Sequence, residues 1–157
     1  IGCGMGNLVE ELRKKNIDAR GIEISSYALE KAKDSVKPYL SYGDITDIPY
    51  DDNSFDLVVT YDVLEHLERS HLQRAIKESI RVSRRWILHK IYTRENKLIH
   101  LLHAKDHSQR SVLTQQYWLN LFKYIPNITV SSKGIRLPEL FESLFLLEKN
   151  PNIASSV

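Results

Sequence analysis

The chain has 157 residues, of which 42% are hydrophobic and 27% are charged. This balance is typical of a globular protein and excludes a disordered or collagen-like chain. The 22 basic and 20 acidic residues leave a formal net charge of +2, which is too small to indicate a nucleic-acid or membrane-surface partner. We predict a single domain over residues 1–157, because this length provides one hydrophobic core.

Cysteine content and hydropathy bear on the compartment. Cys3 is the only cysteine in the sequence, which excludes an internal disulfide and fits a reducing compartment. Apolar runs in the sequence are shorter than the roughly 20 residues that cross a bilayer, and the first residues lack the basic and apolar regions of a signal peptide. We therefore expect a cytoplasmic protein without a membrane segment.

The first part of the chain predicts a helix, a strand and a second helix. Residues 7–16 carry apolar side chains on one helical face, and residues 18–25 are short and apolar at their centre, as in a strand. The serine pair 25–26 offers an N-cap for a helix over 27–36. Pro38 is expected to end that helix.

The alternation continues through the middle of the chain. Residues 39–45 predict a short strand and 46–54 are rich in turn formers, whereas 55–62 form the most apolar strand of the sequence. A strand of this kind is expected at the centre of a sheet that is covered on both faces. A helix over 69–83 and a strand over 84–92 follow. The pattern predicts an α/β protein with parallel strands and helices on both faces of the sheet.

The last third of the sequence is less regular. Residues 93–112 are polar and rich in histidine, and 113–125 predict an amphipathic aromatic helix with Thr114 as its N-cap. Two strand candidates follow, at 127–134 and 142–149. We expect them to pair as an antiparallel hairpin at the end of the sheet.

Three glycines stand on alternate positions before the first predicted helix: Gly2, Gly4 and Gly6. A glycine turn between a strand and a helix lets the backbone approach a ligand, and a helix N-terminus offers unpaired N–H groups. The dinucleotide fingerprint has its third glycine one position later, where this chain has Asn7. A pyrophosphate site is therefore disfavoured, and a nicotinamide-dependent oxidoreductase is kept only as an alternative.

Acidic residues follow the next two predicted strands. Glu23 comes 17 positions after Gly6 and ends the strand that follows the glycines. A carboxylate at this point can accept hydrogen bonds from both hydroxyl groups of an adenosine ribose. Asp44 and Ile45 end the following strand, where they are suited to contact the adenine amino group and the adenine ring. The three strand ends together indicate an adenosine-containing ligand.

These motifs occur in the segments "IGCGMGNL" (1–8), "GIEIS" (21–25) and "YGDITDIPYDDNSFDLVVTYDVLEHL" (42–67). In this order they resemble the cofactor motifs of the class I S-adenosylmethionine-dependent methyltransferases, especially those that act on small molecules. The resemblance is good over residues 1–92. It implies a Rossmann-like, mostly parallel sheet with a C-terminal antiparallel strand pair. It also implies that most of the first strand, at the middle of the sheet, lies before Ile1.

The resemblance assigns these residues to S-adenosylmethionine: Gly2, Gly4, Gly6, Glu23, Ile24, Asp44, Ile45 and Tyr61. By similarity the glycines line the methionine moiety and the ribose, and Glu23 holds the ribose hydroxyls. Ile24 and Ile45 are expected to sandwich the adenine, Asp44 to contact its amino group and Tyr61 to face the cofactor. With or without a ligand, both isoleucines are expected to face the core.

Candidate catalytic residues follow the fourth cofactor motif. Methyl transfer from a sulfonium requires alignment, and a general base is needed only when the acceptor must lose a proton. His66 is our candidate base for a hydroxyl acceptor. The spacing of Asp62, Glu65 and His66 also resembles that of the metal ligands in some methyltransferases. The same short sequence occurs at this position in family members that bind no metal, so we predict no metal.

The segment 93–112 follows the fifth predicted strand, and ligands of open α/β sheets bind at the carboxyl ends of the strands. We expect this segment to cover the acceptor and His107 to contact it. His100 and His103 together with His107 have a spacing compatible with zinc, but no partner ligand of a recognised pattern accompanies them. A polar loop is the preferred interpretation.

The sequence thus predicts methyl transfer from S-adenosylmethionine to a small-molecule or glycan-type acceptor by in-line displacement. The alternatives are the oxidoreductase and a non-catalytic subunit or fragment with a cofactor-type fold. Intact glycines and Glu23 argue against the non-catalytic alternative, whereas the absent part of the first strand favours a fragment. The sequence does not indicate the acceptor atom or the oligomeric state.

Overall fold

A computed structural model describes residues 1–93, 110–130, 135–137 and 142–150. In these ranges the helices are α1 (Asn7–Lys14), α2 (Ser26–Lys31), α3 (Arg69–Val82) and α5 (Gln115–Lys123), with single 3-10 turns η1 (Lys37–Tyr39) and η2 (Leu64–His66). The strands are β1 (Gly21–Glu23), β2 (Leu40–Tyr42), β3 (Phe55–Tyr61), β4 (Ser83–Tyr92), β5 (Ile128–Val130), β6 (Ile135–Leu137) and β7 (Glu142–Lys149). No helix in these ranges is long and apolar enough to cross a membrane.

The strands of the described ranges form two ladders. In the smaller one, β1 and β2 are parallel, with Glu23 opposite Tyr42. In the larger one, β3 and β4 are parallel, and β7 pairs with β4, β5 and β6 in antiparallel fashion. The α/β class, the parallel sheet and the antiparallel pairing of the last strands are confirmed.

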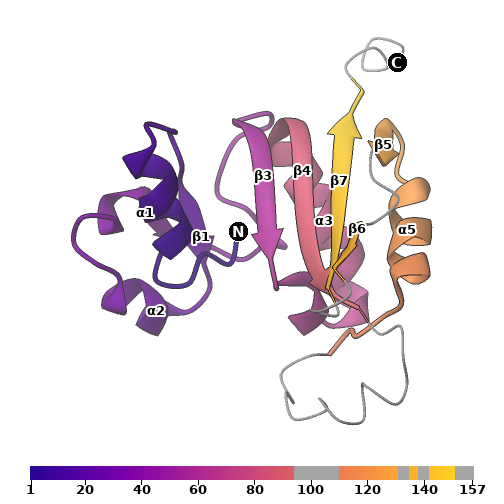
Figure 1. Ribbon diagram of the computed structural model, residues 1–157, viewed down its shortest axis with the longest axis horizontal. Coiled ribbons are helices and arrows are strands. Elements are labelled where there is room, and N and C mark those ends of the chain that lie inside the picture. Colours follow the sequence, from indigo (N-terminus) through magenta and orange to yellow (C-terminus); the bar gives the residue numbers. More distant parts are fainter. Residues whose placement is uncertain (94–109, 131–134, 138–141, 151–157) are drawn as a thin grey trace.

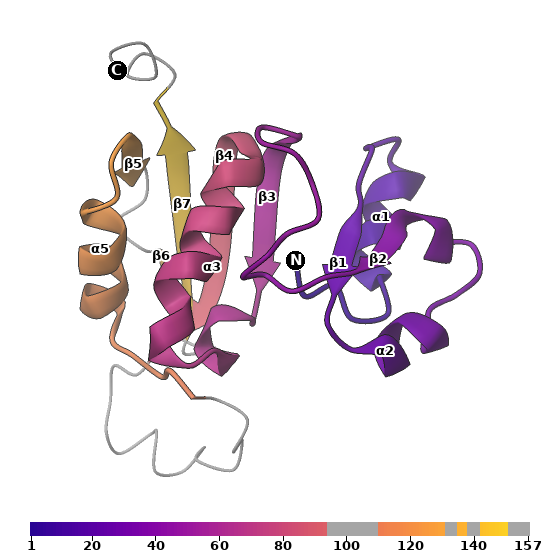
Figure 2. The ribbon, with the colours of Figure 1, turned by 180° about the vertical axis from the view of Figure 1, so that it is seen from behind.

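The helices lie on both sides of these strands. α3 covers one face of β3 and β4, whereas α1 lies on the opposite side of the molecule next to β1 (Figures 1 and 2). The core between α3, α5 and the larger ladder contains the fully buried side chains of Ile76, Ile87, Trp118, Phe122 and Phe145. Apolar side chains at helical spacing on α3 and at alternate positions on β4 and β7 produce this packing.

The start of the chain runs between the two ladders. The main-chain nitrogen of Ile1 donates to the carbonyl of Val59 in β3 (2.7 Å), and the amides of Gly2 and Cys3 donate to the carbonyl of Ile22 in β1 (2.9 and 3.1 Å). A groove of about 980 Å³ extends from these residues between α1 and β3. Ile1 therefore lies at the middle of the strand array, where the sequence analysis places the end of the first strand.

The prediction that residues 55–62 form a central strand covered on both faces is wrong for the described ranges. β3 is the last strand of the larger ladder, and the side chain of Leu57 is exposed beside the groove. Within those ranges no strand pairs with the edge of β3 that faces β1. The apolar composition of β3 is that of an inner strand, but its pairing here is on one side.

Two further elements differ from the prediction. The second helix ends at Lys31, because Ala32 adopts an extended backbone conformation, and Pro38 lies inside η1 instead of ending the helix. The hairpin expected from 127–134 and 142–149 contains an additional strand, β6, which pairs with the first half of β7. The N-caps at Ser25 and Thr114 are confirmed, since their side chains accept hydrogen bonds from the amides of Ala28 and Tyr117.

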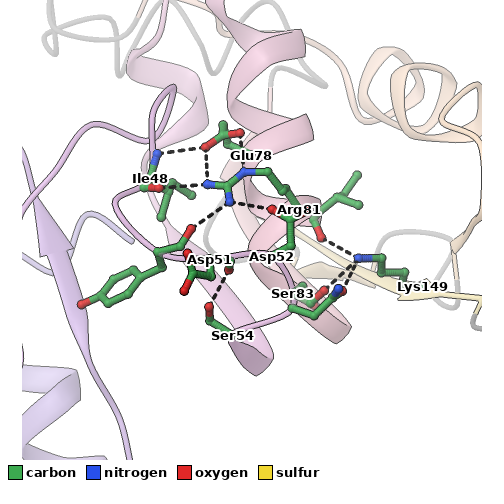
Figure 3. A network of polar contacts seen from close by, with 11 residues as sticks. Ile48, Asp51, Asp52, Ser54, Glu78, Arg81, Ser83 and Lys149 are labelled. Carbon is green, nitrogen blue, oxygen red and sulfur yellow. Dashed lines mark hydrogen bonds and ion pairs between the residues drawn. The ribbon is translucent and has the colours of Figure 1, made fainter.

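A polar network fixes the loop between β2 and β3 to α3 (Figure 3). The guanidinium of Arg81 donates to the carbonyls of Ile48 and Tyr50 and to the carboxylates of Asp52 and Glu78, at 2.8 to 2.9 Å. Glu78 also accepts a bond from the amide of Ile48 (3.0 Å). These contacts raise the pKa of Arg81, and the hydrogen bonds to Glu78 make the largest contribution. The loop that follows Asp44 is thereby held in place by α3.

Candidate active site

The glycine turn is built from left-handed backbone. Gly2, Gly4 and Gly6 have φ angles of 68°, 54° and 80°, which residues other than glycine rarely adopt. The amide of Gly6 donates to the carbonyl of Cys3 (2.9 Å), and Gly6 is the N-cap of α1. The turn therefore ends at a helix N-terminus, as the glycine spacing predicts.

The three glycines have different surroundings. A Cβ atom on Gly2 would lie 2.4 Å from Cγ2 of Val63, and one on Gly6 would lie 2.8 Å from Cδ1 of Leu40. A Cβ atom on Gly4 would meet no atom of the described residues within 4 Å. Gly2 is thus constrained by its packing against Val63, and Gly6 by its left-handed φ with the movable end of Leu40 nearby. Gly4, by contrast, exposes its backbone to open space where a ligand can approach it.

Glu23 is fixed by two main-chain amides. Its Oε2 accepts a hydrogen bond from the amide of Gly4 (2.8 Å), and its Oε1 accepts one from the amide of Ser25 (2.9 Å). The carboxylate is partly exposed at the end of β1. Each oxygen has further acceptor capacity, so the carboxylate can receive hydroxyl donors from a ligand while it stays fixed to the turn.

Asp44 and Ile45 follow β2 and differ in their roles. Oδ1 of Asp44 accepts hydrogen bonds from the amide and the hydroxyl of Thr46 (2.8 and 2.9 Å). Ile45 belongs to the core with 5% exposure, as expected, whereas the prediction that Ile24 faces the core is wrong, because Ile24 is 58% exposed. The end of β1 leaves Ile24 outside the sheet, where an apolar ligand surface could cover it.

Three side chains interact at the carboxyl ends of β3 and β4. Tyr61 is 54% exposed, and the ammonium of Lys90 lies 3.8 Å from the centroid of its ring. Lys90 also donates to both oxygens of Asp62, at 2.9 and 3.0 Å. Asp62 has a φ of 54°, which is unusual for a residue other than glycine.

Glu65 joins η2 to two other parts of the chain. Its Oε1 accepts a hydrogen bond from the amide of Tyr92 (2.9 Å), and its main-chain carbonyl accepts bonds from the amides of Arg110 and Ser111 (2.9 and 2.8 Å). The side chain is fully buried, and its Oε2 has no hydrogen-bond partner among the residues that the structure describes. Burial raises the pKa of Glu65. The end of β4 and residue 110 are thus both held beside η2.

The structure places some of the predicted catalytic residues and not others. His66 is partly buried in η2, next to Glu65 and four residues after Asp62. His107, with His100 and His103, lies outside the described residues. In the described ranges, no group of three potential metal ligands is close enough to hold an ion. Asp62 is instead bound to Lys90, and Glu65 to the end of β4.

Two residues of this region had no part in the sequence analysis. Lys90 contacts both Tyr61 and Asp62, and Arg81 fixes the loop after Asp44. The sequence could have indicated Lys90, because a lysine in the apolar strand "WILHKIY" (86–92) requires a partner when it is buried. It could not have indicated Arg81, because an arginine near the end of an amphipathic helix is ordinarily a surface residue.

The geometry can now be compared with known proteins. Residues 1–85 match the family described as "Methyltransferase domain". The chain belongs to this family. The class I S-adenosylmethionine-dependent methyltransferase family predicted from the motifs is therefore confirmed, and S-adenosylmethionine is the cofactor that membership implies.

Individual relatives of this methyltransferase-family chain agree with the assignment. Ajmaline N-methyltransferase of Rauvolfia serpentina is 33% identical over 91 residues, which are 53% of this chain and 31% of the relative. The chain thus spans less than a third of that relative's length. A SAM-dependent methyltransferase from Archaeoglobus fulgidus has a TM-score of 0.73 at 12% identity, with 94% of this chain and 83% of that chain covered. The cyclase SpnF has a TM-score of 0.74 at 16% identity, with coverage of 95% and 72%. These two structures share the fold.

Proposed function

We propose that this chain transfers the methyl group of S-adenosylmethionine to a small-molecule or glycan-type acceptor. The observation that carries the proposal is the meeting of three features at one edge of the strands. Gly4 exposes left-handed backbone to open space, Glu23 is bound to the Gly4 amide, and Asp44 follows the neighbouring strand β2 by two residues. Backbone approach, a fixed carboxylate and a second acid are the groups that suit an adenosine carrying a sulfonium side chain.

The residues present fit the cofactor. Gly2, Gly4 and Gly6 would border the methionine moiety and ribose, and Glu23 would accept hydrogen bonds from the ribose hydroxyls. Oδ1 of Asp44 accepts both hydrogen bonds from Thr46, so Oδ2 would receive the adenine amino group. Exposed Ile24 would cover one face of the adenine. Ile45 is only 5% exposed, so only a small part of its side chain would contact the other face of the adenine. Tyr61, which is exposed, would face the cofactor.

Methyl transfer itself requires little or no proton transfer by the protein. A lone pair of the acceptor attacks the methyl carbon, the carbon–sulfur bond breaks, and its electron pair neutralises the sulfonium. Alignment of the acceptor with that bond is the main requirement. A base is needed only for an acceptor that must lose a proton. For that case we propose His66, which follows Glu65 in η2, and His107 as an acceptor contact.

The nature of the acceptor remains part of the proposal. The relative from Rauvolfia serpentina is named for N-methylation of ajmaline, which agrees with a small-molecule acceptor. The near-neutral charge of the chain gives no support for a nucleic-acid acceptor. A fold shared with a cyclase is compatible with different chemistries, so the test has to measure cofactor binding and methyl transfer separately.

Calorimetric titration with S-adenosylmethionine and S-adenosylhomocysteine tests the cofactor site. We expect the unaltered chain to bind both and Glu23→Ala to bind at least about tenfold more weakly, because hydrogen bonds to a charged group are lost. Glu30→Ala, on the exposed side of α2, is the matched control and should bind normally. Equal affinity for the Glu23→Ala variant and the unaltered chain would contradict the proposed site.

Methyl transfer is tested with methyl-labelled S-adenosylmethionine and a panel of amines, phenols, carboxylic acids and sugars. Label in a product supports the activity and identifies the acceptor atom. The oxidoreductase alternative is measured in parallel by the change of NADH fluorescence on mixing. NADH binding without S-adenosylmethionine binding would favour that alternative.

A further inference from the structure

Lys90 is a buried charged residue near the proposed cofactor site. It stands opposite Tyr61 in the parallel ladder of β3 and β4. Its side chain is 5% exposed, and its ammonium donates to both carboxylate oxygens of Asp62. The same ammonium lies 3.8 Å from the centroid of the Tyr61 ring. One buried cation therefore contacts two neighbouring residues at the end of β3.

This arrangement is unfavourable unless something else requires it. Burial of an ammonium is costly, and an ion pair of this kind is often no more stable than apolar side chains of the same size. The pair is also unequal, because the side chain of Asp62 is 42% exposed and can be hydrated, whereas that of Lys90 is only 5% exposed. Asp62 supports the lysine energetically, and the lysine in turn restricts Asp62.

The backbone of Asp62 gives a second observation. Its φ of 54° is in the left-handed region, although its amide still donates to the carbonyl of Lys90 (3.1 Å). A left-handed residue other than glycine persists where surrounding contacts determine its conformation, and such residues are concentrated at functional sites. The ladder bond and the ion pair to Lys90 provide those contacts.

We propose that Lys90 is a positioning residue for the cofactor side of the site. It contacts the ring of Tyr61 and binds both carboxylate oxygens of Asp62, and so fixes the end of β3. Lys90 lies against the Tyr61 ring while 54% of that residue stays exposed, and this exposed part is the surface left for a ligand. The role toward S-adenosylmethionine rests on the function proposed above.

The first measurement does not involve the cofactor. The chain has eight tyrosines, which can be labelled as 3-fluorotyrosine and observed by fluorine NMR, with the Tyr61 signal assigned from Tyr61→Phe. We expect Lys90→Met to shift or broaden the Tyr61 signal and leave the tyrosines outside β3 unchanged. Lys77→Met, on the exposed side of α3, is the matched control. An unchanged Tyr61 signal in folded Lys90→Met would overturn the proposal.

The second measurement separates positioning from general loss of structure. We expect Lys90→Met to weaken S-adenosylmethionine binding by about tenfold, as for loss of a desolvated cation–ring contact. In a Tyr61→Ala background the same substitution should have less than about a threefold effect, because its target is gone. An equal loss of affinity in both backgrounds would show a merely structural role and overturn the proposal. If the unaltered chain fails to bind S-adenosylmethionine, the proposed function fails, whereas the fluorine signal still decides the role of Lys90.

Discussion

The main-chain amide of Gly4 donates a 2.8 Å hydrogen bond to Oε2 of Glu23, 19 residues further along the chain. The bond fixes the carboxylate in the orientation set by the glycine turn. A second amide, that of Ser25, holds the other oxygen. A ligand that uses Glu23 therefore meets a carboxylate whose rotamer is already chosen, and little side-chain entropy is lost on binding.

The glycine turn predicts a contrast between two alanine substitutions. Gly2→Ala should destabilise the fold by about 3 kcal/mol, because a left-handed φ is combined with a Cβ placed 2.4 Å from Val63. Gly4→Ala should cost only about 1 kcal/mol, since its Cβ would enter open space. Urea unfolding measures both values.

Cofactor binding by the Gly4→Ala variant tests whether Gly4 has a role in binding. Gly4→Ala places a methyl group where the ligand would approach, so it should weaken S-adenosylmethionine binding more strongly than it weakens the fold. Calorimetry on the folded variant provides the comparison. Unchanged affinity in Gly4→Ala would show that the open space beside Gly4 is not the ligand site.

The contacts of Arg81 with the loop after Asp44 predict an effect on stability. Arg81→Met removes the hydrogen bonds that the guanidinium donates to the carbonyls of Ile48 and Tyr50 and to the carboxylate of Glu78. We expect the free energy of unfolding to fall by about 2 to 3 kcal/mol. Arg84→Met is the matched control. It removes an exposed ion pair with Asp56 and should cost less than about 0.5 kcal/mol. Similar losses in the two variants would contradict the role assigned to Arg81.

The strand ends that form the site could be predicted from local sequence. The glycine spacing, Glu23 and Asp44 each belong to a short segment whose conformation is determined nearby, and the caps at Ser25 and Thr114 have the same origin. The amphipathic pattern of α3 and the apolar run of β3 likewise required no knowledge of distant contacts. These elements occur close to their predicted positions.

The features that the sequence analysis missed depend on contacts between distant parts of the chain. The bonds of Glu65 join it to Tyr92 and to Arg110, and Lys90 reaches back 28 residues to Asp62. The early end of α2 and the place of Pro38 in η1 reflect packing of Ala32 and Val36 against Val9 in a small separate core. No periodicity in the local sequence encodes these pairings, because loop closure brings the partners together only in the folded chain.

Glu65 predicts a stability that falls as the pH rises. Burial raises its pKa in the folded chain above the ordinary value of 4.5. Between 4.5 and that raised pKa, the folded chain retains a proton that the unfolded chain has lost, so a rise in pH favours unfolding. Glu65→Gln keeps an acceptor for the Tyr92 amide and cannot ionise. Its stability relative to the unaltered chain should therefore increase as the pH is raised from about 4.5.

Chemical denaturation at a series of pH values measures this difference. Glu65→Ala serves as the comparison, because it loses the bond to Tyr92 as well as the charge. It should be less stable than Glu65→Gln by about 1 kcal/mol or more at every pH. A difference between Glu65→Gln and the unaltered chain that does not vary with pH would contradict the assignment.

His89 predicts a pH dependence of the opposite sign. Its ring is fully buried and stacked on Phe122, and its Nδ1 shares a 2.7 Å hydrogen bond with the hydroxyl of Thr60. Burial lowers the pKa of His89 from 6.5 to about 3. Below pH 6.5 the unfolded chain binds a proton that the folded chain excludes, so stability is fully present above this value and is lost as the pH falls toward 3. The contribution of His89 alone should reduce the free energy of unfolding by about 2 kcal/mol between pH 7 and pH 5.

The variant His89→Gln isolates this contribution, because its amide can still bond to Thr60 but does not titrate in this range. We expect its unfolding free energy to fall by about 2 kcal/mol less than that of the unaltered chain between pH 7 and pH 5. His71→Gln, which removes an exposed histidine of α3, should keep the full dependence. Equal slopes for His89→Gln and His71→Gln would mean that the ring of His89 accepts a proton in the folded chain, and would contradict its burial as a neutral side chain between Thr60 and Phe122.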